Sequence, residues 1–338
     1  MDKNLELQIS DFKECTRTGP FWSAFRERGY TLSESASTEA GVLVRLTSPN
    51  GSSWLTATNV SYPMVSGIVE RISQNKILSY DFAKNIGIEV PDTEIAYKGQ
   101  PIGKSQLLSK YKLVVVKPLD SFGSRGLTVN VDSKQQLDRS LKKSYQYSET
   151  ALVQQQVEGS EFRFTIIDGK VVSILLRQPP NVVGDGHSSV AELIKKENIA
   201  RSHLKFPHVV YPPLTETIID AKYINDHKTV PQKDETVEFS RATMIKDGAS
   251  VYEMIDKAHE SYKDIAEKLA AELGANFIVV DIFIKSIELP AKKDMYWFNE
   301  FNTSPAIRMY YGVRNMNASH IADMIIDKTD KAIRSMRE

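Results

Sequence analysis

Apolar positions change their spacing along the chain, and this spacing predicts where helices and strands lie. Between residues 68 and 86 apolar side chains recur at helical spacing, and Gly87 follows as a typical helix-ending residue. The clearest helical pattern covers residues 251–273 and stops at Gly274. A further helix is expected after Ser133, where apolar residues recur every four positions.

Short apolar runs bounded by turn residues predict strands. Asp168-Gly169 joins two of these runs and is typical of a hairpin turn. Ser189-x-x-Glu192 predicts a capped helix start, and the prolines after it indicate that residues 201–250 are largely irregular. This mixture favours an α+β architecture over a doubly wound sheet. The strands are expected at 112–117, 127–131, 151–157, 161–167, 171–177, 276–285 and 295–302.

The first 75 residues have a weaker pattern. Short apolar pieces at 41–46 and 54–57 are separated by polar, turn-rich stretches such as Thr47–Gly51. We therefore expect a small α/β domain at this end of the chain.

Composition and charge narrow the function classes. Apolar residues make up 41% of the chain and charged residues 25%, as in soluble globular proteins. Lysine plus arginine equals aspartate plus glutamate at 43 each, so neither nucleic acid nor a membrane is expected as a partner. The single cysteine, Cys15, excludes an intrachain disulfide and a cysteine zinc site. The polar start and the lack of apolar runs near the roughly 20 residues of a spanning helix predict a cytoplasmic protein.

Polar residues interrupt the last two predicted strands. Asp281 lies within the apolar run 278–284, and a buried aspartate is costly unless it is paired or bound to a metal. Glu300 and Asn302 are two residues apart on the next strand and so point from the same face. Two carboxylates and an amide oxygen suit a hard cation such as Mg²⁺. A buried, hydrogen-bonded polar cluster explains the same residues, so both interpretations are open at this point.

A strand-ending lysine and a loop of small residues form a second constellation. Lys117 can project its ammonium onto a phosphate, and backbone N–H groups of the loop at 121–126 can surround one. A lysine beside an ordinary turn is the alternative. Residues 99–105, Gly-x-x-x-Gly-Lys-Ser, resemble a phosphate-binding P-loop but are one residue short and have no evident following helix, so we reject that motif.

Residues 154–161, with the sequence Gln-Gln-Gln-Val-Glu-Gly-Ser-Glu, form a third constellation. A strand edge that passes into a loop can offer backbone groups to an adenine ring, and side chains to its amino group and to the ribose hydroxyls. Taken alone, the segment is equally well a polar strand end.

These pieces occur in the order of the ATP-grasp ligases, which the chain resembles from about Thr56 to about Gly312. Most similar is the C-terminal ATP-grasp module of the bifunctional glutamate–cysteine ligase/glutathione synthetases; cyanophycin synthetase and, more distantly, D-alanine–D-alanine ligase are also similar. The segments that carry the resemblance are 75–78 (NKIL), 114–118 (VVVKP), 158–164 (EGSEFRF), 177–186 (RQPPNVVGDG), 261–266 (SYKDIA), 273–275 (LGA), 299–302 (NEFN) and 305–306 (PA).

The resemblance implies an α+β ATP-grasp fold, in which two α+β subdomains grip ATP, preceded by a small α/β N-terminal domain. It divides the chain into three parts. Residues 1–75 are the N-terminal domain, 76–158 the central or lid subdomain, and 159–338 the C-terminal subdomain with the magnesium and substrate site.

The resemblance also implies a nucleotide site. Lys76 and Lys117 match the two lysines that contact ATP phosphates. Gln154, with Gln155 beside it, lies where the family places a side chain near the adenine amino group, and Val157 matches a backbone contact to the ring. Glu161 matches the ribose ligand. The flexible cover over the phosphates is implied to contain Ser121, Gly123, Ser124 and Gly126.

For the metal, the resemblance implies that Asp281, Glu300 and Asn302 bind two Mg²⁺ ions, for which Mn²⁺ can substitute, with Glu300 as the bridge. The implied reaction transfers the γ-phosphoryl group of ATP to a carboxylate, and an amine then attacks the acyl phosphate. An amide bond forms, and ADP and phosphate are released. The implied partners are a small-molecule or peptide carboxylate and an amine, expected to be an amino acid, and a homodimer is the family's habit.

The chain departs from its relatives at two places. D-Alanine–D-alanine ligase has an arginine two residues before the magnesium aspartate, where this chain has Val279. Another cation must then neutralise the transferring group, and the candidates are Arg177, Arg241 and Arg308. The glycine- and serine-rich loop of the relatives is also replaced after Arg241, which weakens glutathione as the product. Arg308 is alternatively a surface arginine in a loop.

Two other functions are carried as alternatives. In the first alternative, the chain is an ATP-grasp modifier of a ribosomally made peptide, and its first 75 residues recognise a leader segment. In the second, it is a non-catalytic nucleotide-binding regulatory protein. Retention of both lysines and of the complete metal set argues against the last, because a degenerate site usually loses a metal ligand.

Overall fold

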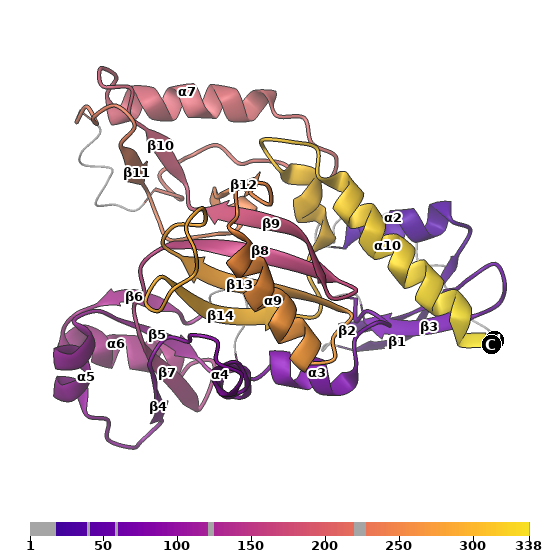
Figure 1. Ribbon diagram of the computed structural model, residues 1–338. Coiled ribbons are helices and arrows are strands. Elements are labelled where there is room, and N and C mark those ends of the chain that lie inside the picture. The colour runs from indigo at the N-terminus through magenta and orange to yellow at the C-terminus, as the bar shows by residue number, and fades with distance from the viewer. Residues whose placement is uncertain (1–17, 39–40, 58–59, 121–124, 220–227, 338) are drawn as a thin grey trace.

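The computed structural model describes residues 18–38, 41–57, 60–120, 125–219 and 228–337 (Figure 1). These ranges contain three antiparallel sheets, a two-stranded ribbon and the helices that cover them, so the α+β prediction is confirmed. Within them, every helix is too short or too polar to cross a membrane. Four residues named above lie outside the described ranges: Cys15, Ser121, Gly123 and Ser124.

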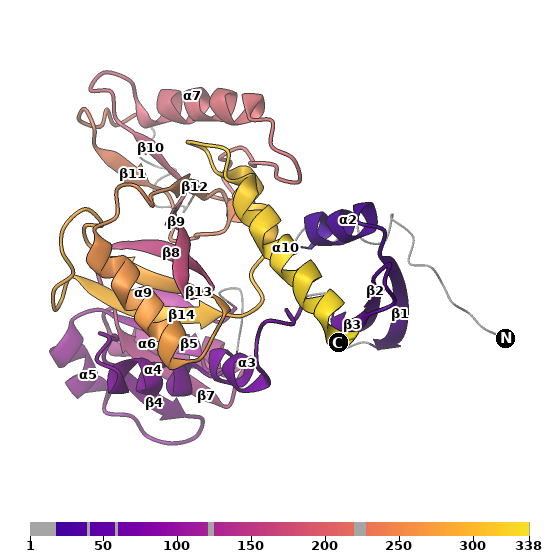
Figure 2. The ribbon, with the colours of Figure 1, turned by 45° about the vertical axis from the view of Figure 1, so that its right-hand side comes forward.

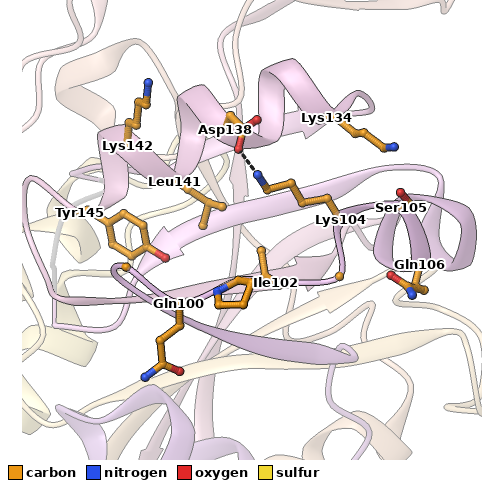
Figure 3. Close-up of a pocket in the computed structure, with 13 residues that line it drawn as sticks. Gln100, Ile102, Lys104, Ser105, Gln106, Lys134, Asp138, Leu141, Lys142 and Tyr145 are labelled. Carbon is orange, nitrogen blue, oxygen red and sulfur yellow. Dashed lines mark ion pairs between the residues drawn. The ribbon is translucent and has the colours of Figure 1, made fainter.

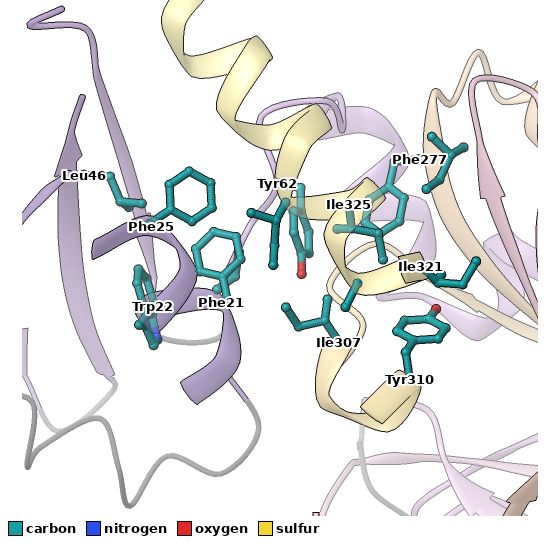
Figure 4. Close-up of a cluster of buried hydrophobic side chains, with 14 of the residues drawn as sticks. Phe21, Trp22, Phe25, Leu46, Tyr62, Phe277, Ile307, Tyr310, Ile321 and Ile325 are labelled. Atoms are coloured by element: carbon teal, nitrogen blue, oxygen red, sulfur yellow. The ribbon is translucent and has the colours of Figure 1, made fainter. Parts of the chain in front are cut away.

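The N-terminal part of the described chain is one helix and a three-stranded sheet of order β1-β2-β3. Helix α10 (Ser319–Arg334) lies between this part and the large sheet (Figure 2). Aromatic residues of α2 and isoleucines of α10 meet Phe277 of the large sheet in one apolar cluster, which joins the two ends of the chain (Figure 4). The bounds are α2 Gly19–Glu27, β1 Thr31–Thr38, β2 Gly41–Thr47 and β3 Ser53–Ala57.

The helical pattern at residues 68–86 forms two helices, α3 (Gly67–Ser73) and α4 (Lys76–Asn85), so the prediction of one helix is wrong. The break has a local cause. The side chain of Asn75 accepts hydrogen bonds from the backbone N–H groups of Ile77 (3.0 Å) and Leu78 (3.1 Å), which is an N-cap. A new helix therefore begins at Lys76, and both helices pack on β14 (Tyr296–Asn302).

The second sheet has the order β4-β7-β5-β6, and helices α5 and α6 contribute to its own small core. The strand and helix predictions at 112–117, 127–131, after Ser133 and at 151–157 agree with this sheet to within a few residues. The bounds are β4 Thr93–Tyr97, α5 Lys104–Tyr111, β5 Val114–Pro118, β6 Thr128–Val131, α6 Lys134–Ser144 and β7 Thr150–Gln155.

The rejected P-loop segment at 99–105 does lead into a helix, α5, so that part of the rejection is wrong. The spacing is still one residue short. The segment lines a groove of about 500 Å³ against α6, and across it Lys104 forms an ion pair with Asp138 (Figure 3). The lysine that a P-loop would direct at phosphate is therefore paired with a carboxylate.

The third and largest sheet has the order β12-β9-β8-β13-β14. Helix α9 (Glu260–Glu272) packs on β8, β9 and β13 and covers one face (Figure 1). The hairpin predicted at Asp168-Gly169 connects β8 to β9 and is confirmed. The bounds are β8 Ser160–Ile167, β9 Lys170–Gln178, β12 Ser250–Glu253, β13 Phe277–Ile284 and β14 Tyr296–Asn302.

The helix predicted at 251–273 begins only at Glu260, so the first nine residues of that prediction are wrong. Val251 belongs to β12 and pairs with Arg177 of β9. The side chain of His259 accepts the backbone N–H of Ser261 at 3.2 Å and caps α9. Val251 is buried in the strand, whereas Met254, Ile255 and Ala258 are partly buried in the turn that follows, so the helical spacing of these residues does not correspond to a helix.

Between β9 and β12 the chain makes an excursion with its own small core. The capping box predicted at Ser189 and Glu192 is confirmed at the start of α7 (Val190–His203). Beyond α7 the described residues up to 235 contain neither helix nor sheet strand, as the prolines predict. The bounds of the remaining elements are β10 Asn181–Val183, β11 Thr236–Glu238, and the short 3₁₀ helices η1 Ile245–Asp247, η2 Ile307–Gly312 and η3 Ser335–Arg337.

Candidate active site

Side chains alternate along each strand of the large sheet, so one face packs under α9 and the opposite face, the polar face, carries the charged side chains beside apolar residues such as Phe277. On β8, Phe162, Phe164 and Ile166 enter the core under α9. Glu161 and Arg163 alternate with them and therefore point to the opposite face. The same alternation on β13 (Phe277–Ile284) places Asp281 on that polar face.

Asp281 is fully buried and is held by a two-pronged ion pair. The Nε of Arg163 donates to Oδ1 of Asp281 at 2.7 Å, and Nη2 donates to Oδ2 at 2.6 Å. The register of β8 and β13 sets the two residues directly opposite each other. Burial lowers the pKa of Arg163, but the charge of Asp281, the hydrogen bonds to it and the nearby charges of Glu161 and Glu300 together outweigh burial and hold that pKa above its ordinary value. The cost of burying this carboxylate is thereby offset.

Arg177 of β9 extends this network. Its Nη1 donates to Oε1 of Glu161 at 2.8 Å and lies 3.5 Å from Oδ2 of Asp281, and its Nε donates to the carbonyl of Thr243 at 3.2 Å. Burial raises the pKa of the Glu161 carboxyl, and the Arg177 charge opposes the rise. Of the three arginines expected near the transferring group, Arg177 lies in the cluster.

Strand β14 brings Glu300 and Asn302 to the same place. Glu300 pairs with Asp281, and a register shift follows, so that Ile282 pairs with Phe298 and Asn299 is the extra residue of a bulge. The Nδ2 of Asn302 donates to Oε1 of Glu300 at 3.2 Å, which shows that both side chains share one face. The three expected metal ligands therefore lie on adjacent strands.

The two lysines expected to contact phosphates lie beside this strand. Lys76, in the first turn of α4, donates from Nζ to the carbonyl of Leu119 at 3.1 Å. Burial and the nearby Lys117 charge lower the pKa of Lys76, and the charge of Glu300 opposes this. The Nζ of Lys117 lies 3.5 Å from Oδ1 of Asn299, next to Glu300 in the chain. The structure thus brings both lysines close to Glu300 of β14.

The expected adenine segment ends the second sheet and leads into the third. Gln154 is buried, and its Nε2 donates to the hydroxyl of Thr93 at 2.8 Å. Gln155 is half-buried at the end of β7, and Val157 is half-buried in the link to β8. Gly126 has φ +73°, and a β-carbon there would lie 2.7 Å from Pro118, so the end of the expected phosphate cover requires glycine.

The other two arginines lie differently. Arg241 is exposed and pairs with Glu238 at 4.0 Å, although the neighbouring Thr243 contacts Arg177. Arg308 is half-buried in η2, so it is not in an exposed loop. The neighbour Met309 lies 3.9 Å, through its sulfur, from Nη1 of Arg163, which places η2 over the polar face.

The donor set fits a hard cation. Asp281 and Glu300 supply carboxylate oxygens and Asn302 an amide oxygen, the ligand types that Mg²⁺ prefers. A carboxylate has about four acceptor positions, so Asp281 can accept both Arg163 and a metal ion. The described residues contain no group of three or more histidine, cysteine, aspartate or glutamate side chains arranged to hold a metal.

Sequence reasoning missed three residues of this site: Arg163, Asn299, and Tyr80, whose hydroxyl accepts a hydrogen bond from Nζ of Lys117 at 2.8 Å. Arg163 has a signal, because it is two residues after Glu161 on a strand whose intervening residues are apolar. Tyr80 also has one, since it follows Lys76 by four residues and so shares its helix face. The bulge at Asn299 has no signal in the sequence that we can identify.

The fold itself is that of an ATP-grasp enzyme. A crystal structure of a bifunctional glutathione synthetase from Pasteurella multocida superposes with a TM-score of 0.61 at 20% sequence identity, covering 93% of this chain and 44% of that chain. The predicted α+β ATP-grasp fold is thus confirmed.

Sequence comparison gives the relatives. The chain is 28% identical over 266 residues to the glutathione biosynthesis bifunctional protein GshAB of Desulfotalea psychrophila, covering 75% of this chain and 33% of that protein. It is 26% identical over 219 residues to cyanophycin synthetase of a Nostoc species, covering 63% of this chain and 24% of that one. The predicted resemblance is confirmed. No protein-family model matches, and the chain spans about a third of the length of the curated relatives it matches first.

Proposed function

We propose that the chain is an ATP-dependent, ADP-forming ligase that joins a carboxylate to an amine. One observation carries the proposal: Lys76 and Lys117 lie beside β14, whose Glu300 and Asn302 adjoin the buried Asp281. Cations for phosphate and oxygen ligands for a divalent metal therefore meet at one place. This combination is what phosphoryl transfer requires, since it needs mainly positioning and charge neutralisation.

In the proposed reaction an oxygen of the substrate carboxylate attacks the γ-phosphorus of ATP, and the bond from that phosphorus to the β-phosphate oxygen breaks. ADP leaves and an acyl phosphate remains. The amine then attacks the acyl carbon, loses a proton, and expels phosphate, which leaves an amide. Lys76 and Lys117 would bind the phosphate oxygens, and Arg177 is the arginine best placed to face the transferring group.

Asp281, Glu300 and Asn302 would hold magnesium, which supplies positive charge to the phosphates when bound. Arg163 would keep Asp281 in place, because its two hydrogen bonds fix the orientation of the carboxylate.

The nucleotide base is assigned to the link between the two sheets. Gln154, Gln155 and the backbone of Val157 would contact adenine, and Glu161 the ribose. The contact of Gln154 with Thr93 and the ion pair of Glu161 with Arg177 would hold those side chains in place before ATP binds. The lid would be residues 76–158, closing over residues 159–338.

For the substrates, we infer a small-molecule or peptide carboxylate and an amino acid as the amine. The functions for which the relatives are named, glutathione biosynthesis and cyanophycin synthesis, support this class. Arg308 lies in η2 beside the polar face, and we assign it to the carboxylate of one substrate, for which a guanidinium offers a two-pronged contact.

The test is ADP and phosphate release from Mg-ATP with pools of carboxylic acids, peptides and amino acids. We expect release that requires one acid and one amine together, and a new amide in the mixture by mass spectrometry. The variant Glu300→Gln should fold with an unchanged Tm and lose at least about 100-fold in turnover, because a ligand charge is removed from the metal. Nucleotide binding without stimulated release by any pair would instead leave a binding protein, and the ligase proposal would be abandoned.

A further inference from the structure

Tyr80 lies between the lysines and the metal-ligand strand β14 of the proposed ATP site. It lies on α4 one turn after Lys76, so both side chains leave the same face of the helix. The Tyr80 side chain is 5% exposed, and α4 packs on β14. Tyr80 therefore reaches from the helix of one lysine toward the strand of the metal ligands.

The hydroxyl of Tyr80 accepts a hydrogen bond from Nζ of Lys117 at 2.8 Å. The same Nζ lies 3.5 Å from Oδ1 of Asn299 and 5.4 Å from the centre of the Tyr80 ring. The lysine of the second sheet is thus held by one residue of α4 and one residue of β14. Since an ammonium group has three N–H donors, these two contacts leave one donor for a phosphate oxygen.

Tyr80 and the strand that carries Asn299 are themselves held in place by neighbouring groups. The Tyr80 ring meets the ring of Phe298 edge to face, with centroids 6.1 Å apart, and Phe298 is fully buried. The backbone N–H of Phe298 donates to the carbonyl of Glu89 at 2.8 Å. The bulge that follows it turns Asn299 toward Lys117, while Glu300 turns toward Asp281. A rigid tyrosine and a rigid strand therefore bracket a flexible lysine.

We propose that Tyr80 is a positioning residue for nucleotide binding, whose hydroxyl, together with the Asn299 amide, orients the Lys117 ammonium toward the ATP phosphates. The inference rests on the proposed function, because it takes Lys117 as a phosphate ligand. Without the hydroxyl, the four-carbon stem of Lys117 samples other rotamers, and part of the cost of ordering it falls on ATP binding. An oriented Lys117 stabilises bound ATP equally in the ground state and in the transition state, so loss of this orientation should weaken ATP binding and leave kcat nearly unchanged.

The measurement is the Kd of Mg-ATP by titration calorimetry, without acid or amine, for the wild type and for Tyr80→Phe. Loss of one hydrogen bond to a charged group predicts an increase in Kd of about ten-fold. In the ligase assay the KM for ATP should rise in proportion, and kcat should change less than about two-fold, because uniform binding is what is lost. Asn299→Ala should raise the Kd in the same direction.

Tyr262→Phe is the matched control. Tyr262 lies in the same apolar cluster, meets the Tyr296 ring edge to face at 6.1 Å, and donates from its hydroxyl to the carbonyl of Ser286 at 3.3 Å. It should show a comparable Tm change with an unchanged Kd. If Tyr80→Phe also keeps the wild-type Kd, Tyr80 has only a structural role and the inference is overturned. If the wild type itself fails to bind Mg-ATP, the proposed function falls first, and this inference falls with it.

Discussion

The change Arg163→Met tests how the buried centre of the site is stabilised. Arg163 makes both of the short hydrogen bonds to Asp281, whose carboxylate is fully buried. Methionine fills a similar volume and carries no charge. The variant therefore leaves a buried carboxylate with Arg177, at 3.5 Å, as its remaining cationic neighbour.

The magnitude follows from these contacts. Removing one partner of a buried ion pair typically costs about 3–5 kcal/mol, because the other charge is left uncompensated. Arg177 compensates in part, so we expect about 3 kcal/mol. For a chain longer than the usual single domain, about 2 °C of Tm is lost per kcal/mol, which predicts a Tm lower by roughly 6 °C.

Differential scanning calorimetry and urea unfolding followed by tryptophan fluorescence measure the effect. Arg241→Met is the matched control, since the exposed Arg241 pairs with Glu238 at 4.0 Å and its loss should change the Tm little. The double variant Arg163→Met/Asp281→Leu removes both charges and should recover most of the loss. A single variant that costs less than about 1 kcal/mol, or a double variant as unstable as the single one, refutes the reasoning about an uncompensated charge.

Two further predictions follow from local features. Burial and the Lys117 charge lower the pKa of Lys76, so Lys76 loses its charge as the pH rises through that lowered pKa. The affinity for Mg-ATP, measured by calorimetric titration, should fall over the same pH range. The variant Lys76→Arg stays charged and should remove this pH dependence. Gly159, in the link between the two sheets, has φ +118°, and a β-carbon there would lie 2.6 Å from the backbone of Ile284. Gly159→Ala should therefore lower the Tm far more than Gly169→Ala, where φ is +75° but the space is open. Equal effects of the two changes would show that the close approach to Ile284 carries no cost.

Much of the large sheet follows from the sequence because its strands alternate cleanly. On β8 the apolar Phe162 separates Glu161 from Arg163, and this alternation alone places the two charged side chains on one face. Asp281 stands out for the same reason within an apolar run. A local period of two thus predicts which face carries the chemistry. It does not predict partners, since pairing depends on register between strands that are more than 100 residues apart.

One of the two wrong helix predictions has its origin in non-local structure. The apolar residues before α9 continue a helical spacing, yet β12 pairs with β9 and takes Val251 into the sheet, so tertiary pairing overrides the local pattern. The break between α3 and α4 was within reach of local reasoning, because Asn75 is a strong capping residue in front of Lys76.

The bulge in β14 shows why the alternation of apolar and polar residues does not predict the whole site. Without the extra residue, Asn299 and Glu300 would continue a strict alternation and point to opposite faces of the sheet. With it, Glu300 pairs with Asp281 while Asn299 contacts Lys117, so one short segment serves both the second and the third sheet. A displacement of β14 moves the lysine contact and the carboxylate contact together. In the proposed site, the same strand would therefore set the positions of the nucleotide phosphates and of the metal, and Tyr80, which packs on Phe298 of that strand, would transmit its register to Lys117.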